Sequence, residues 1–394
     1  MKQLINIICG GGLLLIHPFS YGDGLDNWHL RYSAPEGIYF SSIASGPDRF
    51  VAVSESGRIA TSTDAVQWTL ADFRTTARLD SVAFGNGAFV VTGYPDTVIR
   101  STDGTNWQSA GWQELATLPG MVDFANGQFL LLARDEGGSG PMLFVSSTGT
   151  NWSINRMRPN PALDAPLLFS AAYGNSNYVA VGTRSDVFGL GLKGPLVMIS
   201  PDTFAWEHIP LTQSFLWSFG VEFESVTFGK GLFVAVGSGF IAYSADGRNW
   251  NLVNDVFVGV HRVAYGDGVF VAGGAGQFAT STDGVHWRKR DSGHPWSSIP
   301  GITYTQNTFV SLLGGQIWQS DPIASLTLGR SSPLELSING PVGKTFQVEA
   351  TEDLGATNGW ETVASFVLTN SPSTWVDSGS TNKSQRFYRA VLQP

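Results

Sequence analysis

Four side chains capable of acid–base or electrostatic chemistry stand at the starts of apolar segments that recur along the chain: Asp80, Glu224, His261 and Arg262. Glycoside hydrolysis needs one carboxyl group as an acid and a second carboxylate or a substitute nucleophile. Asp80 and Glu224 would supply such a pair if the fold brought them together. Polar residues are also common where a strand begins at solvent, so the catalytic hypothesis competes with a structural one.

Five further residues are candidates for ligand binding because they lie in or beside segments that interrupt the recurring pattern. An aromatic shelf suits a sugar ring, and charged side chains near it suit glycoside chemistry, although aromatic side chains equally cap a core. The five residues are Arg134, Arg184, Trp217, Glu222 and Trp296.

Metal and cofactor chemistry finds no support in the residue pattern. The six histidines show no His-x-x-x-His or similar ligand spacing. The single cysteine, Cys9, lies in an apolar N-terminal segment, so a chain without that segment has no thiol. No phosphate-binding glycine-rich loop precedes a helix, and nothing resembles a nucleophile elbow. The sequence therefore predicts no metal site and no cofactor.

A repeated motif, Ser-x-Asp-Gly-x-x-Trp, organises the chain up to about residue 323 and must position these side chains. Its tryptophans recur about every 40 residues, which is the period of a four-stranded propeller blade. Each motif aspartate can accept hydrogen bonds from the main chain of its own turn, and each tryptophan can anchor the hairpin in the core. The motif aspartates are Asp64, Asp103, Asp202, Asp246 and Asp283.

Seven strand–turn–strand units can be counted between these motifs, and the seventh lacks its outer strand. The segment Asn27–Arg31 near the N-terminus resembles the outer strands at Asn106–Gln108 and His286–Arg290. We therefore predict an all-β, seven-bladed propeller that its N-terminal strand closes, which would leave only short and protected sheet edges.

The motif resembles the Asp-box, or BNR, repeat over roughly residues 26 to 323. The resemblance implies a sialidase-like propeller fold and structural roles for the motif aspartates. Propellers with this repeat include glycosidases, sorting receptors and assembly factors, so the repeat does not imply one function. The nearest match to the sialidase N-terminal motif, Leu30–Pro35, is explained by the repeat itself, and no arginine triad can be matched. The likeness to sialidases is therefore expected in fold only.

The chain divides into three predicted segments. Residues 1–22 resemble a bacterial-type signal peptide, because Lys2 precedes an apolar stretch too short to span a bilayer. Residues 23–324 form the predicted propeller. Residues 325–394 alternate as short strands and predict a small β-sandwich, and the ending Arg386–Ala390 resembles a fibronectin type III-like module of secreted bacterial proteins.

Charge and loop length narrow the functional hypotheses. The formal net charge is −9 with only 14% charged residues, which argues against a nucleic-acid partner, and no apolar stretch after residue 22 is long enough to cross a membrane.

Short, uniform turns are expected on the motif face and long loops on the opposite face. We predict a secreted, periplasmic or cell-surface propeller that binds a carbohydrate or an extracellular protein on the long-loop face without catalysis. The alternative is a glycoside hydrolase or lyase with carboxylates at the channel mouth.

Overall fold

The computed structural model describes residues 7–9, 25–110, 117–118, 120–135, 141–157, 164–185, 194–211, 222–237, 240–253, 259–274, 277–290, 299–305, 307–321, 323, 325–328, 334–340, 343–353, 359–370, 373–379 and 386–392. The chain forms two compact units. The larger comprises residues His29–Thr305 and Phe309–Gln319, and the smaller comprises Met1–Trp28, Gln306–Thr308 and Ser320–Pro394.

The larger unit is built from antiparallel sheets, seven among the described residues, that follow one another along the chain. The first holds β3 (Phe40–Ser45), β4 (Phe50–Ser54), β5 (Arg58–Ser62) and β6 (Thr69–Arg74); the second holds β7 (Arg78–Gly85), β8 (Ala88–Tyr94), β9 (Thr97–Ser101) and β10 (Gln108–Ser109). The third holds β11 (Thr117–Leu118), β12 (Val122–Ala125), β13 (Gln128–Asp135), β14 (Pro141–Ser146) and β15 (Ser153–Arg156). The fourth holds β16 (Asp164–Gly174), β17 (Asn177–Ser185), β18 (Gly194–Ser200) and β19 (Glu207–His208).

The remaining three sheets complete the set. The fifth holds β20 (Ser225–Gly229), β21 (Leu232–Gly237), β22 (Phe240–Ser244) and β23 (Asn251–Leu252); the sixth holds β24 (Val260–Gly266), β25 (Val269–Gly274), β26 (Gln277–Ser281) and β27 (Arg288–Arg290). The seventh joins β28 (Ile302–Thr305), β29 (Thr308–Leu313) and β30 (Gln316–Ser320) to the N-terminal strand β2 (Trp28–Ser33), which pairs with β30. The all-β prediction, including closure by the N-terminal strand, is therefore confirmed.

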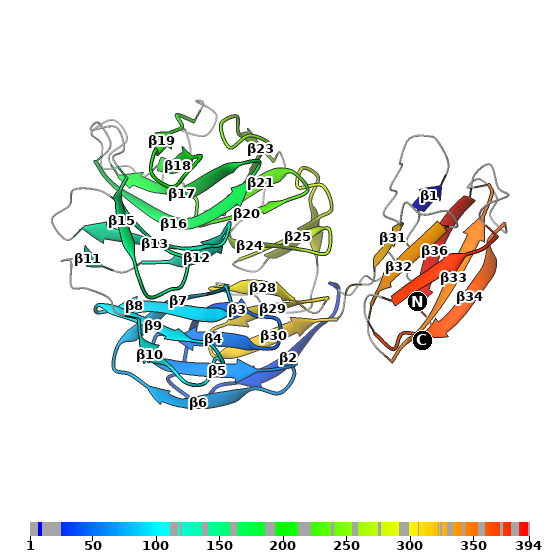
Figure 1. Ribbon diagram of the computed structural model, residues 1–394, viewed down its shortest axis with the longest axis horizontal. Coiled ribbons are helices and arrows are strands. Elements are labelled where there is room, and N and C mark those ends of the chain that lie inside the picture. Colours follow the sequence, from blue (N-terminus) through cyan, green and yellow to red (C-terminus); the bar gives the residue numbers. More distant parts are fainter. Residues whose placement is uncertain are drawn as a thin grey trace. The chain divides into compact units, whose positions relative to one another are not determined.

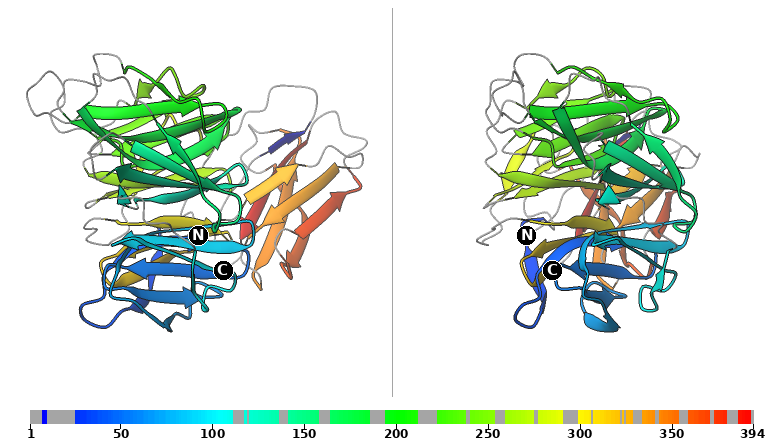
Figure 2. Two further views of the ribbon diagram at one scale, coloured as in Figure 1. Left: turned by 60° about the vertical axis from the view of Figure 1, so that its left-hand side comes forward. Right: turned by 90° about the vertical axis from the view of Figure 1, so that its left-hand side faces the viewer.

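The first strands of the sheets form a closed ring. In ring order they are β3, β7, β12, β16, β20, β24 and β28, and each contacts the next, with β28 returning to β3. The blue strands β2 and β3 accordingly lie beside the yellow strands of the last sheet (Figures 1 and 2). The second strands are buried over most of their length, and β4 is buried throughout, which agrees with their nearly continuous apolar sequences.

Glycines on the inner strands allow close packing between neighbouring sheets. An aromatic ring of one sheet lies against a glycine of the sheet before it: Phe124 against Gly85, and Tyr304 against Gly266. A methyl group added at Gly266 would lie 1.9 Å from Tyr304 Cγ. Within each hairpin the same aromatic residues pack on the second strand, as Tyr304 does on Phe309 at a ring-centroid distance of 4.8 Å.

The motif aspartates each accept hydrogen bonds from their own turns. Asp103 Oδ1 accepts from the main-chain N–H groups of Thr105 and Asn106, both at 2.8 Å, and from Ser101 Oγ. These hydrogen bonds hold the pKa of Asp103 well below its usual range. Four motif tryptophans donate Nε1–H to the carbonyl three residues earlier, as Trp287 does to Gly284 at 3.0 Å.

Turns between the first and second strands lie on the face of the motif hairpins. Asn86 and Gly87 both have positive φ angles, as a two-residue hairpin turn of this twist requires. Asn86 Nδ2 donates at 2.8 Å to the carbonyls of Gly127, in the next such turn, and Ser147, in a motif hairpin. Because inner strands therefore end on this face, they start on the opposite face, where Asp80 lies.

The smaller unit contains two sheets. One has the order β1 (Ile7–Cys9), β36 (Arg386–Leu392), β33 (Thr345–Thr351) and β34 (Glu361–Val367); the other has the order β31 (Ser325–Leu328), β32 (Leu334–Asn339) and β35 (Ser373–Asp377). Its core includes Leu336, Phe346 and Tyr388. Asp377 accepts hydrogen bonds from Arg386 and Tyr388. Strand β1 lies in the predicted signal peptide, whose cleavage would remove it from the sheet.

Among the described residues, no helix has the length and apolar character that crossing a membrane requires.

Candidate functional site

Serine side chains on the inner strands tie neighbouring sheets together around the central channel. In each case Oγ accepts a hydrogen bond of 3.1 to 3.3 Å from a main-chain N–H of the next inner strand. The pairs are Ser42 with Val82, Ser81 with Val122, Ser170 with Val226, and Ser225 with Val263. These small side chains leave room for a polar channel cavity of about 450 Å³ that all seven inner strands line.

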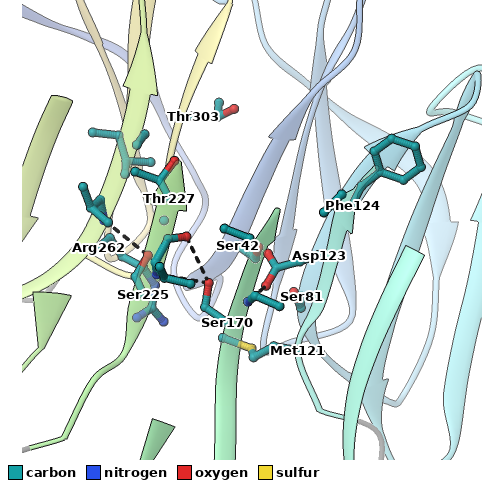
Figure 3. A pocket seen from close by; sticks show the side chains of 18 of the residues that line it. Ser42, Ser81, Met121, Asp123, Phe124, Ser170, Ser225, Thr227, Arg262 and Thr303 are labelled. Carbon is teal, nitrogen blue, oxygen red and sulfur yellow. Dashed lines mark hydrogen bonds between the residues drawn. The ribbon is translucent and has the colours of Figure 1, made fainter. Parts of the chain in front are cut away.

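Two long side chains, Met121 and Arg262, replace this serine on the third and sixth inner strands. Beside Met121, the linking role passes to Asp123, whose Oδ2 accepts a 2.7 Å hydrogen bond from the Ala171 N–H. Figure 3 shows Asp123 facing Ser81 and Ser170 in the channel. Burial raises the pKa of Asp123 to about 6.

A second cavity of about 530 Å³ opens at the channel end where the inner strands start, and we call it the mouth cavity. Met121, Phe169, Arg262 and Pro300 line both cavities, so they form the partition between them. The residues that line the mouth cavity include a charged group and an apolar group, which we call its charged wall and its apolar wall. The charged wall comprises Glu55, Arg78 and Asp80; the apolar wall comprises Leu132, Ala133, Leu167, Leu168 and Phe169.

Three of the four residues proposed for catalysis meet in one cluster. His261 Nδ1 lies 2.7 Å from Glu224 Oε1, and Arg262 Nη1 lies 3.6 Å from Glu224 Oε2. Arg262 Nε also donates to the Pro300 carbonyl at 2.9 Å, and Nη1 donates to the His261 carbonyl at 3.0 Å. Burial lowers the pKa of Arg262, although Glu224 and Asp123 oppose the shift.

Asp80, the fourth of these residues, lies across the mouth cavity from that cluster. Arg78 Nε contacts Asp80 Oδ1 at 2.6 Å. Burial nevertheless raises the pKa of Asp80, and the negative charge of Glu55 adds to the rise. Glu224 and Asp80 thus do not face one another as a simple pair: Glu224 lines the channel cavity, whereas Asp80 lines the mouth cavity.

Of the five ligand-binding candidates, Arg184 and Glu222 have described side chains, and neither lines one of the two cavities. Arg184 is half-buried, its Nε has no hydrogen-bond partner among the described residues, and burial lowers its pKa. Glu222 is half-buried and precedes β20. Trp217, Trp296 and the side chain of Arg134 lie outside the described residues, so these hypotheses stay predictions.

Sequence reasoning overlooked four residues beside the mouth cavity. Tyr39 and Tyr94 are 59% and 53% exposed. The Glu55 N–H donates to the Tyr39 carbonyl at 3.0 Å, and Arg78 pairs with Tyr94 between β7 and β8. We call Tyr39, Glu55, Arg78, Asp80 and Tyr94 the rim. These residues share one feature that the sequence could have shown. Each lies beside or at one end of a first or second strand, and that end is on the face opposite the motif hairpins.

Asp123→Asn is expected to remove a pH dependence of stability. Because burial raises the pKa of Asp123 to about 6, against about 3.9 in an unfolded chain, the folded state binds this proton more tightly. The free energy of unfolding of the wild type therefore falls by about 2 kcal/mol from pH 4 to pH 7 through this group. Asparagine retains an acceptor for the Ala171 N–H and does not titrate.

Urea unfolding at pH 4 and pH 7, followed by tryptophan fluorescence, measures this difference. Asp123→Asn is expected to gain stability relative to the wild type as the pH rises, whereas Asp72→Asn, at an exposed position on β6, is expected to follow the wild type. An unchanged pH profile in Asp123→Asn would contradict the assignment.

Comparison with known proteins establishes the architecture. No protein-family model and no curated protein matches the chain. Among solved structures, YCF48 bound to D1 peptide is similar at 17% identity and a TM-score of 0.54, covering 74% of this chain and 94% of that one. Virginiamycin B lyase from Staphylococcus aureus gives 10% identity, a TM-score of 0.58 and coverages of 74% and 98%. PorZ of Porphyromonas gingivalis is similar at 11% identity and a TM-score of 0.56, covering 90% of this chain and 57% of that one. At these identities the likeness concerns the fold alone: the chain contains a β-propeller.

Proposed function

We propose that this protein is a secreted, non-catalytic binding or scaffolding propeller that holds an extracellular polypeptide on the rim and in the mouth cavity. The observation that carries the proposal is that two exposed tyrosines, Tyr39 and Tyr94, pair through the main chain with Glu55 and Arg78, which line a cavity of about 530 Å³. Exposed tyrosine and arginine are the side chains that most often dominate the binding energy of protein interfaces.

The apolar wall of the mouth cavity favours a polypeptide over a carbohydrate. The half-buried residues Leu167 and Phe169 present hydrocarbon there, which suits an apolar or long side chain better than a ring covered with hydroxyl groups. Two structural neighbours have names consistent with such a role: YCF48 was solved with a D1 peptide, and PorZ is a bacterial surface component of a type-IX secretion system.

A glycoside hydrolase or lyase is the second candidate, and one observation favours it. Glu55 and Asp80 line the same cavity, and burial raises the pKa of Asp80, as a catalytic acid requires. Under this alternative Asp80 would donate a proton to the leaving group and Glu55 would act as the second carboxylate.

Screening the purified protein on a random-peptide array and a glycan array tests both candidates. Under the proposal, peptides bind, and Tyr39→Ala combined with Tyr94→Ala weakens binding at least about tenfold, equivalent to about 1.4 kcal/mol. Phe204→Ser is the matched control, because Phe204 is 67% exposed in a motif hairpin on the opposite face. Glycans that are consumed by the wild type and retained by Asp80→Asn would instead support the enzyme and overturn the proposal.

A further inference from the structure

We infer that the mouth cavity binds a primary ammonium group on an aliphatic stem, as in the side chain of a lysine of the bound polypeptide. This inference rests on the proposed function and names the residue type that anchors the partner.

The first argument is the balance of charge around the cavity. Two carboxylates and two guanidinium groups line it: Glu55, Asp80, Arg78 and Arg262. The Arg78 guanidinium is paired with Asp80 at 2.6 Å, and that of Arg262 faces Glu224 at 3.6 Å and two main-chain carbonyls. The described residues provide no ion-pair partner for Glu55. One further cation would therefore meet an unneutralised carboxylate.

The behaviour of Asp80 supports the same conclusion. Its pKa is raised even though Arg78 is in contact, because burial and the nearby Glu55 charge both disfavour the carboxylate form. A cation placed between Glu55 and Asp80 would relieve their mutual repulsion. An anion would add to this repulsion, and the guanidinium of Arg262 is already engaged by Glu224.

The second argument is the apolar part of the cavity lining. Leu167 and Phe169 line the same cavity as the charged residues, and both are half-buried. A lysine side chain has four methylene groups that pack on apolar surface while its ammonium reaches a polar edge. Its compact charge donates three hydrogen bonds in adjustable directions, whereas the planar arginine fork favours coplanar carboxylate oxygens. The cavity volume of about 530 Å³ lies within the usual range of ligand pockets.

A positional-scanning hexapeptide library provides the first probe, measured on the purified full chain. Sub-libraries with lysine fixed at one position are expected to bind at least tenfold more tightly than those with norleucine, which keeps the stem and lacks the charge. Sub-libraries with fixed glutamate are expected to bind below the library average. Fixed arginine is expected to bind more weakly than fixed lysine.

Variants of the charged wall then test whether the preference for lysine over norleucine arises in the mouth cavity. Glu55→Gln, at an exposed position, and Asp80→Asn are each expected to reduce the lysine-over-norleucine ratio to threefold or less. Asp72→Asn removes an exposed carboxylate on β6 and is expected to leave the ratio unchanged.

The outcomes separate the two proposals. If no hexapeptide sub-library binds, the proposed polypeptide-binding function fails. If peptides bind and norleucine or arginine equals lysine, or if the lysine ratio survives both wall variants, the ammonium site fails while polypeptide binding stands. Circular dichroism of each variant confirms that the sheets are retained.

Discussion

Gly266→Ala is expected to lower the free energy of unfolding by about 3 kcal/mol. The added methyl group would lie 1.9 Å from Tyr304 Cγ and 2.1 Å from Cδ1. It would therefore overlap the aromatic ring that Tyr304 of the neighbouring sheet packs against this glycine. Tyr304 cannot swing freely aside because its ring also packs on Phe309 at 4.8 Å. The two inner strands must therefore separate. Urea unfolding followed by tryptophan fluorescence measures the loss.

Gly268→Ala is the matched control in the same hairpin. Gly268 has a positive φ of 79°, and a methyl group there would meet the end of the Lys230 side chain, with Cε at 3.5 Å and Nζ at 3.7 Å, which are ordinary contacts. Its expected loss is the conformational cost of about 1 to 2 kcal/mol. Equal losses at the two glycines would show that the ring contact does not limit sheet spacing. Tyr304→Ala combined with Gly266→Ala is expected to lose less than the sum of the single variants.

Trp287→Ala is expected to lower the free energy of unfolding by about 3 to 5 kcal/mol. Trp287 is 7% exposed, belongs to the core cluster between the fifth and sixth sheets, and packs beside Phe270 at 6.3 Å. Its Nε1–H also donates to the Gly284 carbonyl at 3.0 Å, so the variant loses both a core side chain and the clamp of its hairpin. The same denaturation experiment provides the measurement.

Phe204→Ala serves as the control for Trp287→Ala, because it also truncates an aromatic side chain in a motif hairpin. Phe204 is 67% exposed, so its loss is expected to stay within about 0.5 kcal/mol. A comparable loss in both variants would argue that hairpin composition, and not burial of the tryptophan, sets stability.

The all-β architecture and the closing strand were predictable because they depend on local, repeated patterns. A strand–turn–strand unit and its tryptophan specify one sheet without reference to the rest of the chain. The resemblance of the segment at Trp28 to the outer strands also identified the partner of β30, which the structure confirms. Because the sheets repeat, the pairing of two segments far apart in sequence could be predicted by comparing one of them with the equivalent strands of other sheets.

The candidate site was predictable only in part, because it depends on contacts between sheets. The sequence placed Glu224 and His261 at the starts of neighbouring inner strands. The structure shows that Glu224 Oε1 and His261 Nδ1 lie 2.7 Å apart. The sequence did not predict that Asp123, in place of a serine at position 121, would bond to the next inner strand. This hydrogen bond depends on where the main chain of the next sheet lies. Tyr39, Glu55, Arg78 and Tyr94 were missed because they lie at strand ends, whereas binding residues were expected in the long loops. Trp217 and Trp296 stay predictions.

Closure by the N-terminal strand has a mechanical consequence. The chain enters the ring through β2 and leaves it through β30, so both connections belong to the same sheet. Arg31 on β2 and Gln319 on β30 are 288 residues apart in sequence yet joined by a 2.8 Å hydrogen bond, a contact that chain entropy makes late to form. A pulling force applied at the two ends of the ring therefore loads this single seam first. The other six sheets bear load only after the seam has opened.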